Sequence, residues 1–257
     1  MGIRENLEII KKQLPPRVKL VAVSKFHPVE RLMEAYDAGQ RLFGENRPQE
    51  FAAKVPLMPA DVQWHFIGHL QTNKLKLVLP HASLVESVDS MHLLEAINAW
   101  GAANGKVVPI LLELHLGAEE TKHGFSEEDI FEIINCRQGT VSRRLSRPWL
   151  MNGRGPSLLG RDEDRRSEGD GIQYPAANNL EFRGLMGMAT NTDDEAVIEA
   201  DFARIEALFH RIREEFPELR DTFTELSIGM SGDWPLAVKH GATIVRIGTD
   251  IFGEREY

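Results

Sequence analysis

Eight short apolar runs, each with the character of a β-strand, alternate along this chain with segments of helical character. The runs lie at residues 18–25, 42–45, 62–68, 84–88, 108–116, 182–189, 225–230 and 244–248. Strands that alternate with helices form a closed (β/α)8 barrel or an open doubly wound sheet. The count of eight, in a chain of 257 residues, favours the TIM barrel, which takes about 250 residues.

The segments between the runs predict the helices of such a barrel. Helices are expected near residues 28–39, 46–57, 70–79, 90–104, 126–135, 193–215 and 234–241. A further amphipathic helix precedes the first strand in "MGIRENLEIIKKQL", which carries charges throughout, unlike a secretory signal. We therefore expect residues 1–257 to form a single α/β domain, a TIM barrel with an N-terminal helix.

One segment interrupts this alternation. Residues 136–177 hold eight arginines, six glycines and no lysine, without a sustained period of 3.6 or 2. We interpret the segment as a disordered insertion that precedes strand six, with a short extra hairpin or helix as the alternative. An insertion after a helix and before a strand is expected at the bottom of a barrel, opposite the face that carries chemistry.

The overall composition argues against several kinds of binding partner and against a membrane-spanning or disulfide-bonded protein. The net charge of −9 argues against nucleic acid or an anionic membrane surface as the main partner. Cys136 is the only cysteine, so no intramolecular disulfide can form. No apolar run approaches the roughly 18 residues of a membrane span. We expect a soluble, cytoplasmic protein, as a monomer or weak dimer.

The first strand ends on a lysine, in "VKLVAVSKFHP". Lys25 therefore lies where a buried strand gives way to the next helix, which Pro28 opens. In a barrel the carboxyl ends of the strands form the catalytic face. Lys25 is either a solvated surface residue or a reactive amine on that face.

The last two strand ends resemble a phosphate site. Ser231 and Gly232 follow strand seven, and Gly248 and Thr249 follow strand eight, so small residues, hydroxyls and free N–H groups meet in adjacent loops. Barrels commonly hold a phosphate there. Arg246 is the single charged residue in "ATIVRIG", and its alternation with apolar neighbours predicts that it points into the barrel mouth. The structural alternative is an internal ion pair of Arg246 with Glu45 or Glu225.

A lysine and a phosphate site facing each other across one mouth indicate Schiff-base chemistry with a phosphorylated aldehyde. The predicted cofactor is pyridoxal 5′-phosphate (PLP), which carries both groups. A lysine that forms a Schiff base with a sugar phosphate, as in barrel aldolases, is an alternative, although such lysines usually lie on a later strand beside acid groups.

Several long motifs carry a specific resemblance. "VAVSK", "FGENRPQE", "WHFIGHLQTNK", "RGLMGMATNTDD", "LSIGMSGDW" and "VRIGTDIFGERE" closely resemble the pyridoxal phosphate homeostasis protein family. The resemblance covers residues 1–135 and 178–257, and it departs from the family's pattern in the intervening segment. Proteins of this family are similar to the barrel domain of alanine racemase, of fold-type III.

The resemblance implies roles for particular residues. Lys25 would carry the cofactor as an internal aldimine, and Arg246 would face the pyridine nitrogen. Ser231, Gly248 and Thr249 would hold the phosphate, and the residues around the ring would be Asn46, His65 and Met186. Some relatives have a second lysine two positions after the first. His27 stands there in this chain, so Lys122 would have to supply any such role, unless it is a surface residue of its loop.

Two functional classes remain, a PLP carrier in vitamin B6 homeostasis and a PLP-dependent amino-acid racemase. An arginine at the pyridine nitrogen keeps that nitrogen unprotonated and weakens the ring as an electron sink. A racemase also needs a second acid or base on the opposite face of the substrate, which in alanine racemase is a tyrosine from an extra domain. The chain ends at Tyr257, and its other tyrosines, Tyr36 and Tyr174, lie away from the expected strand ends. We therefore favour the carrier, with PLP-dependent apo-enzymes as potential recipients.

Overall fold

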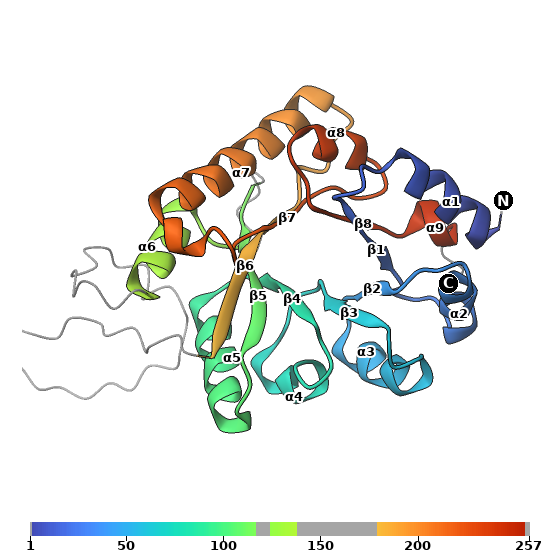
Figure 1. Cartoon of the computed structure of the whole chain (residues 1–257), viewed down its shortest axis with the longest axis horizontal. Coiled ribbons are helices and arrows are strands. Elements are labelled where there is room, and N and C mark those ends of the chain that lie inside the picture. Colours follow the sequence, from blue (N-terminus) through green and yellow to red (C-terminus); the bar gives the residue numbers. More distant parts are fainter. Residues whose placement is uncertain (1, 117–123, 138–178, 255–257) are drawn as a thin grey trace, which may run out of the picture.

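The protein folds as a closed barrel of eight parallel strands, as seen in a computed structural model that describes residues 2–116, 124–137 and 179–254. The strands pair in chain order, and β8 closes the barrel against β1. Figure 1 shows this ring of strands with helices around its outside. The strands are β1 (Lys19–Val23), β2 (Leu42–Glu45), β3 (Gln63–Phe66), β4 (Leu84–Val88), β5 (Val108–Leu114), β6 (Leu180–Gly187), β7 (Glu225–Ser227) and β8 (Ile244–Ile247).

The helices follow the strands in alternation and cover the outer face of the barrel (Figure 1). They are α1 (Ile3–Gln13), α2 (Val29–Asp37), α3 (Pro48–Lys54), α4 (Leu75–Val78), α5 (Met91–Asn104), α6 (Glu127–Arg137), α7 (Glu195–Glu215), α8 (Trp234–Lys239) and α9 (Thr249–Phe252), with 3-10 turns η1 (Val55–Leu57), η2 (Thr72–Lys74) and η4 (Pro217–Leu219). The C-terminal α9 packs beside α1 on the outside of the barrel.

The barrel interior is filled by side chains in layers. Successive residues of a strand point to opposite faces, so every second residue enters the barrel. One inner layer is a compact apolar cluster made of Val21, Leu84, Leu111, Met186 and Ile244. The residues two positions further along several of these strands are polar, which makes the next layer the start of a site.

A bulge between β5 and β6 shapes one side of the barrel. The register of the pair shifts between Ile110 and Leu111, opposite Gly184. Gly184 has φ of +152°, and a Cβ there would lie 1.7 Å from the Glu225 carbonyl oxygen. Only glycine permits this approach, so Gly184 fixes how β6 meets both of its neighbours.

The expected fold class is confirmed, with all eight strands in the expected order. Their ends differ by a few residues, and β7 is shorter than the predicted run, ending at Ser227. The segment expected as a helix at 70–79 is a 3-10 turn followed by the single turn of α4. The helix before the arginine-rich segment extends to Arg137, and the rest of that predicted insertion lies outside the described residues. In the part of the chain that the structure describes, no helix has the length and apolar character needed to cross a membrane.

Candidate functional site

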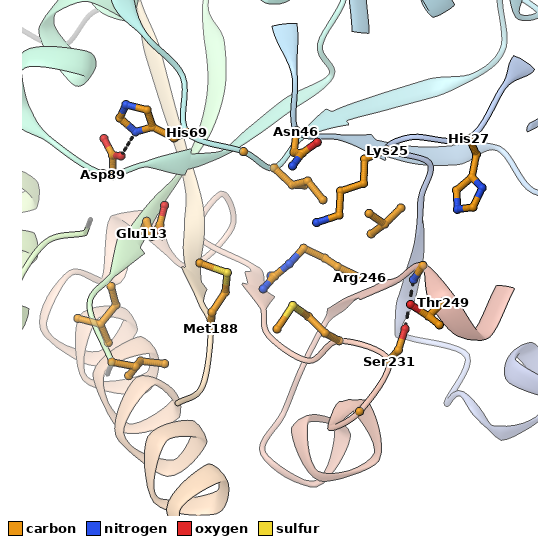
Figure 2. Close-up of a pocket in the computed structure, with 18 of the residues that line it drawn as sticks. Lys25, His27, Asn46, His69, Asp89, Glu113, Met188, Ser231, Arg246 and Thr249 are labelled. Carbon is orange, nitrogen blue, oxygen red and sulfur yellow. Dashed lines mark hydrogen bonds and ion pairs between the residues drawn. The ribbon is translucent and has the colours of Figure 1, made fainter. Parts of the chain in front are cut away.

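A pocket of about 540 Å³ opens at the carboxyl ends of the strands. Its volume lies in the range that small-molecule sites occupy. Figure 2 shows Lys25 and Asn46 directed into it opposite Arg246, with Ser231 and Thr249 on one side and Glu113, Asp89 and His69 on the other. Six of the eight residues predicted for the site line this pocket: Lys25, Asn46, Ser231, Arg246, Gly248 and Thr249.

The turn that presents Lys25 is held by a carboxylate and an ammonium group. Phe26, directly after Lys25, has φ of 68°, a left-handed conformation that is uncommon outside glycine. Its N–H donates to Glu50 Oε1 at 2.7 Å, and the Ser24 carbonyl accepts from Lys54 Nζ at 2.8 Å. Backbone strain persists where surrounding contacts determine it, so this turn aims the Lys25 side chain at the pocket.

Behind the turn lies a buried charged cluster. Lys54 Nζ is 2.7 Å from Glu45 Oε1 and 2.6 Å from Glu50 Oε1. Ser24 Oγ donates to the same Glu45 oxygen at 2.7 Å. Burial raises the pKa of Glu45, and the Lys54 ammonium opposes this by favouring the carboxylate. Glu45 is therefore the partner of Lys54 and not, as the sequence left open, of Arg246.

Arg246 forms the floor of the pocket. Its Nη1 donates to the Ser227 carbonyl at 2.8 Å and to Ser227 Oγ at 2.6 Å, and its Nη2 donates to the Gly187 carbonyl at 2.9 Å. Its ion-pair partner is Glu86, with 3.8 Å between Nη1 and Oε2. The other alternative, Glu225, instead pairs with Lys19 at 2.5 Å at the opposite end of the barrel. Burial lowers the pKa of Arg246, although the nearby carboxylates favour its cationic form.

The carboxylate of Glu86 joins a fully buried polar chain. His65 Nδ1 lies 2.5 Å from Glu86 Oε1, and Ser227 Oγ donates to Glu86 Oε2 at 2.5 Å. Burial alone would raise the pKa of Glu86, but the hydrogen bond and charge of His65, together with Arg246 and Ser227, bring it below its ordinary value. An anionic Glu86 holds Arg246 in one position.

The two loops predicted to form a phosphate site meet as expected. The Gly248 N–H donates to Ser231 Oγ at 3.3 Å, which joins the loop after β7 to the loop after β8. A Cβ on Gly232 would have no atom within 4 Å, so open space lies beside this loop. Hydroxyls and backbone N–H groups that face open space suit an anion.

Asn46 has an unmet hydrogen-bonding group in the pocket. Its Oδ1 is buried and receives no hydrogen bond within the described residues. Gly68 fixes its place, because a Cβ on Gly68 would lie 2.3 Å from the Asn46 carbonyl oxygen. A buried polar atom without a partner is costly, so this oxygen indicates where a bound molecule would donate a hydrogen bond.

Two predicted site residues, His65 and Met186, do not line the pocket. Met186 belongs to the apolar inner layer, and His65 is bonded to Glu86 beneath Arg246. On β6 the residue that lines the pocket is Met188, two positions further on and therefore one layer nearer to the mouth. His65 can act on the site only through Glu86 and Arg246.

The pocket also contains polar residues to which the sequence analysis gave no role in the site, namely His27, His69, Asp89, Glu113 and His115. Glu113 could have been found by the argument that found Arg246, because it is the one charged residue in the apolar run "VPILLELHL". Asp89 follows β4, a strand whose end was passed over. His27 stacks on Phe252 with ring centroids 4.8 Å apart, which no local pattern predicts.

Comparison with known proteins places the chain in a family. The family model "Alanine racemase, N-terminal domain" matches residues 2–142. A pyridoxal phosphate homeostasis protein of Schizosaccharomyces pombe is 34% identical over 260 residues, covering 98% of this chain and 93% of the relative. The chain belongs to the pyridoxal phosphate homeostasis protein family. The human protein of that name is 33% identical, with 93% of this chain and 77% of the relative covered.

Solved structures agree with this family assignment. PipY of Synechococcus elongatus, solved without PLP, superposes with a TM-score of 0.78 at 34% identity over 98% of this chain and 100% of that one. The same protein solved with PLP bound gives a TM-score of 0.77 at the same identity and coverage. Alanine racemase of Corynebacterium glutamicum, at 13% identity, shares the fold, with a TM-score of 0.62 over 99% of this chain and 61% of that one.

Proposed function

We propose that this protein binds PLP, carries it as an aldimine of Lys25 and acts in vitamin B6 homeostasis. The observation that carries the proposal is one pocket in which a lysine, a fixed arginine and two loops of hydroxyls and N–H groups converge. The PLP-bound structure of PipY, a relative at 34% identity, supports the same ligand.

Each lining residue has a distinct proposed role. Lys25 supplies the amine, and Ser231, Gly248 and Thr249 hold the phosphate. Arg246 faces the pyridine nitrogen, and Asn46 lies beside the ring. His65 acts from below, by orienting Glu86 and through it Arg246. Met186 packs in the apolar inner layer of the barrel and does not contact the cofactor ring.

The environment of Arg246 supports a carrier more than a racemase. A guanidinium can donate a hydrogen bond to a pyridine nitrogen but does not give up its proton, so the nitrogen stays unprotonated. The electron-withdrawing power of bound PLP is then weak. Tyr36, the one tyrosine among the described residues, donates its hydroxyl to Asp61 at 2.7 Å on the outer surface, away from the pocket lining. We also propose that PLP-dependent apo-enzymes receive the cofactor from this protein. The protein would act in the cytoplasm, as a monomer or weak dimer.

The decisive experiment is a visible absorption spectrum with PLP, followed by borohydride reduction and peptide mapping. We expect an aldimine band that reduction removes, with the label on the Lys25 peptide. Lys25→Ala should abolish both, while Lys106→Ala, at an exposed lysine, should change neither. An aldimine band that survives Lys25→Ala, with the label on Lys122, would show that the reactive lysine is misassigned.

A second measurement separates the carrier from the racemase. The PLP-loaded protein is incubated with L-alanine in deuterated water, and the Cα proton is followed by NMR. A carrier leaves that proton in place over many hours. Rapid exchange with loss of optical purity would establish catalysis and overturn the carrier.

A further inference from the structure

The side of the pocket away from Ser231 and Thr249 is acidic (Figure 2). It is formed by Asp89 and Glu113, with His69 and His115 beside them, and we call these four residues the acidic compartment. They come from the carboxyl ends of β3, β4 and β5. Asp89 Oδ2 lies 2.6 Å from His69 Nδ1. None of the roles proposed above uses these residues.

The central observation is the burial of the Glu113 carboxylate without a partner in the described part of the chain. It is only 7% exposed, yet within the described residues its carboxylate receives no hydrogen bond and forms no ion pair. Figure 2 shows Glu113 on the same side of the pocket as Asp89, and both residues line it. The guanidinium of Arg246 does not compensate the Glu113 carboxylate by contact, because its hydrogen bonds go to Ser227 and Gly187. Burial and the negative charge of Asp89 raise the pKa of Glu113 to about 7.

A second unmet group lies on the same strand end. His115 Nδ1 is buried and has no hydrogen-bond partner within the described residues. Buried polar atoms are almost always satisfied in folded proteins, so this nitrogen, next to the Glu113 carboxylate in the pocket, indicates a place for a bound molecule. A cation suits this place, because the Glu113 carboxylate lies near a second carboxylate, that of Asp89. N–H donors on that molecule would satisfy the Glu113 carboxylate.

A metal ion fits this compartment poorly. Within residues 2–116, 124–137 and 179–254, no three His, Cys, Asp or Glu side chains are placed to hold one. An ammonium group fits better, because it is a compact cation with N–H donors and no acceptor. An ammonium ion on a small organic molecule would also use the apolar walls nearby, such as Leu116 and Met188.

We propose that the acidic compartment binds the ammonium group of a small primary amine, through Glu113 and Asp89. The proposal rests on the proposed function, because primary amines are the compounds that react with an aldehyde held at Lys25. The compartment would then select which amines approach the cofactor. The side of the pocket opposite the phosphate loops would thus have a binding role of its own.

The test uses propylamine as probe and 1-propanol as its uncharged match, on the full chain without PLP at pH 8. Binding is measured by ligand-observed NMR. We expect propylamine to bind and propanol not to bind. Glu113→Gln keeps the shape but removes the charge, and should weaken propylamine at least about tenfold, since hydrogen bonds to charged groups are worth about 1.5–3 kcal/mol. Asp89→Asn should weaken it as well.

Two controls make the result specific. Glu95→Gln makes the same change at an exposed site on α5 and should leave propylamine binding unchanged. The PLP affinity of Glu113→Gln should stay within about twofold of the wild type, because its change lies away from the phosphate loops. Urea unfolding confirms that each variant is folded.

The outcomes are distinct. Equal propylamine affinity in the wild type and Glu113→Gln would overturn the amine site. The amine site would also be overturned if Glu113→Gln weakened PLP binding as much as it weakened propylamine binding, because Glu113 would then serve the cofactor itself. If the wild type bound propylamine but not PLP, the proposed function would fail while the amine site stood.

Discussion

Glu86 and Arg246 form a buried ion pair under the pocket, with 3.8 Å between Glu86 Oε2 and Arg246 Nη1. Ser227 Oγ bridges them, since it accepts from Arg246 at 2.6 Å and donates to Glu86 at 2.5 Å. Neither side chain is more than 4% exposed. The position of the guanidinium that faces the pocket therefore depends on a carboxylate that the pocket does not reach.

This dependence predicts a large effect of Glu86→Gln. Removing one partner of a buried pair leaves the other charge uncompensated, which costs about 3–5 kcal/mol. We expect the free energy of unfolding, from urea titration at pH 7, to fall by about 3 kcal/mol, because the nearby Glu113 still attracts Arg246. The PLP affinity should fall as well.

The matched control is Glu215→Gln in the exposed pair of Glu215 with Arg211, where Oε1 and Nε lie 2.8 Å apart. Surface pairs contribute about 0–1 kcal/mol, so the urea midpoint should barely move. A loss for Glu86→Gln no larger than for this control would show that Arg246 is held without its buried partner.

Ser231→Ala tests the phosphate site. A hydrogen bond to a charged group is worth about 1.5–3 kcal/mol, so PLP should bind roughly ten- to a hundredfold more weakly. Pyridoxal, which lacks the phosphate, should bind almost as before. Ser83→Ala is the control, since Ser83 Oγ donates to the Trp64 carbonyl at 2.8 Å, away from the pocket lining. Equal losses for PLP and pyridoxal would assign Ser231 a structural role, since its hydroxyl also accepts from Gly248.

The fold was predictable because its signal repeats. Eight apolar runs with helices between them leave few arrangements, and a one-residue error at a strand end changes none of them. The short elements were less predictable. The segment at 70–79 became a 3-10 turn and α4, and α9 was not expected at all. Such short helices are stabilised by packing, which local sequence does not contain.

The site was predictable where one strand end carries one distinctive residue, as for Lys25 and Arg246. The sequence did not show how near to the mouth of the barrel a side chain lies. Alternation along a strand tells which residues point into the barrel, but not which inner layer each belongs to. That is why Met186 was expected at the pocket while Met188 lines it. Partners were also hidden, since Glu86 meets Arg246 from 160 positions away in the chain only once the barrel closes.

Glu113 predicts a specific dependence of stability on pH. Its pKa rises from 4.5 to about 7 on folding, mainly through burial and then through Asp89, with Arg246 opposing. Between these values the folded chain binds more protons than the unfolded chain, so this group's contribution to stability falls as pH rises. The loss is complete above pH 7 and amounts to at most about 3 kcal/mol.

Glu113→Gln removes this titration. The variant should match the wild type near pH 4.5 and exceed its unfolding free energy by up to about 3 kcal/mol at pH 8. Urea unfolding at both pH values measures the difference. Charged or titratable neighbours in the pocket, namely Asp89, Arg246, His69 and His115, are present in both proteins and cancel in the comparison. A constant difference across this range would show that Glu113 titrates normally.

The arginine-rich segment yields the last prediction, because β6 is anchored without it. The Val108 N–H donates to the Asn179 carbonyl at 2.9 Å, and the Asn179 N–H donates to Asn98 Oδ1 at 3.2 Å. These bonds fix the start of β6 next to β5. Among the residues that the structure describes, the pocket lining comes from the barrel strands and the segments that follow their carboxyl ends. Each doubling of a loop costs only about 0.6 kcal/mol, so changing its length should have little effect on stability.

We therefore expect a chain in which a Gly-Ser link of about ten residues replaces 138–178 to keep its PLP spectrum and its affinity within about twofold. The wild type should be cut by trypsin first at Arg143, Arg144, Arg165 or Arg166, as expected of a long segment rich in arginine and glycine. The two fragments should remain together on gel filtration, because β5 and β6 pair along Val108–Leu114 and Leu180–Gly187. Loss of PLP binding on replacement would mean that the segment contributes to the fold or reaches the pocket, against its expected place at the bottom of the barrel.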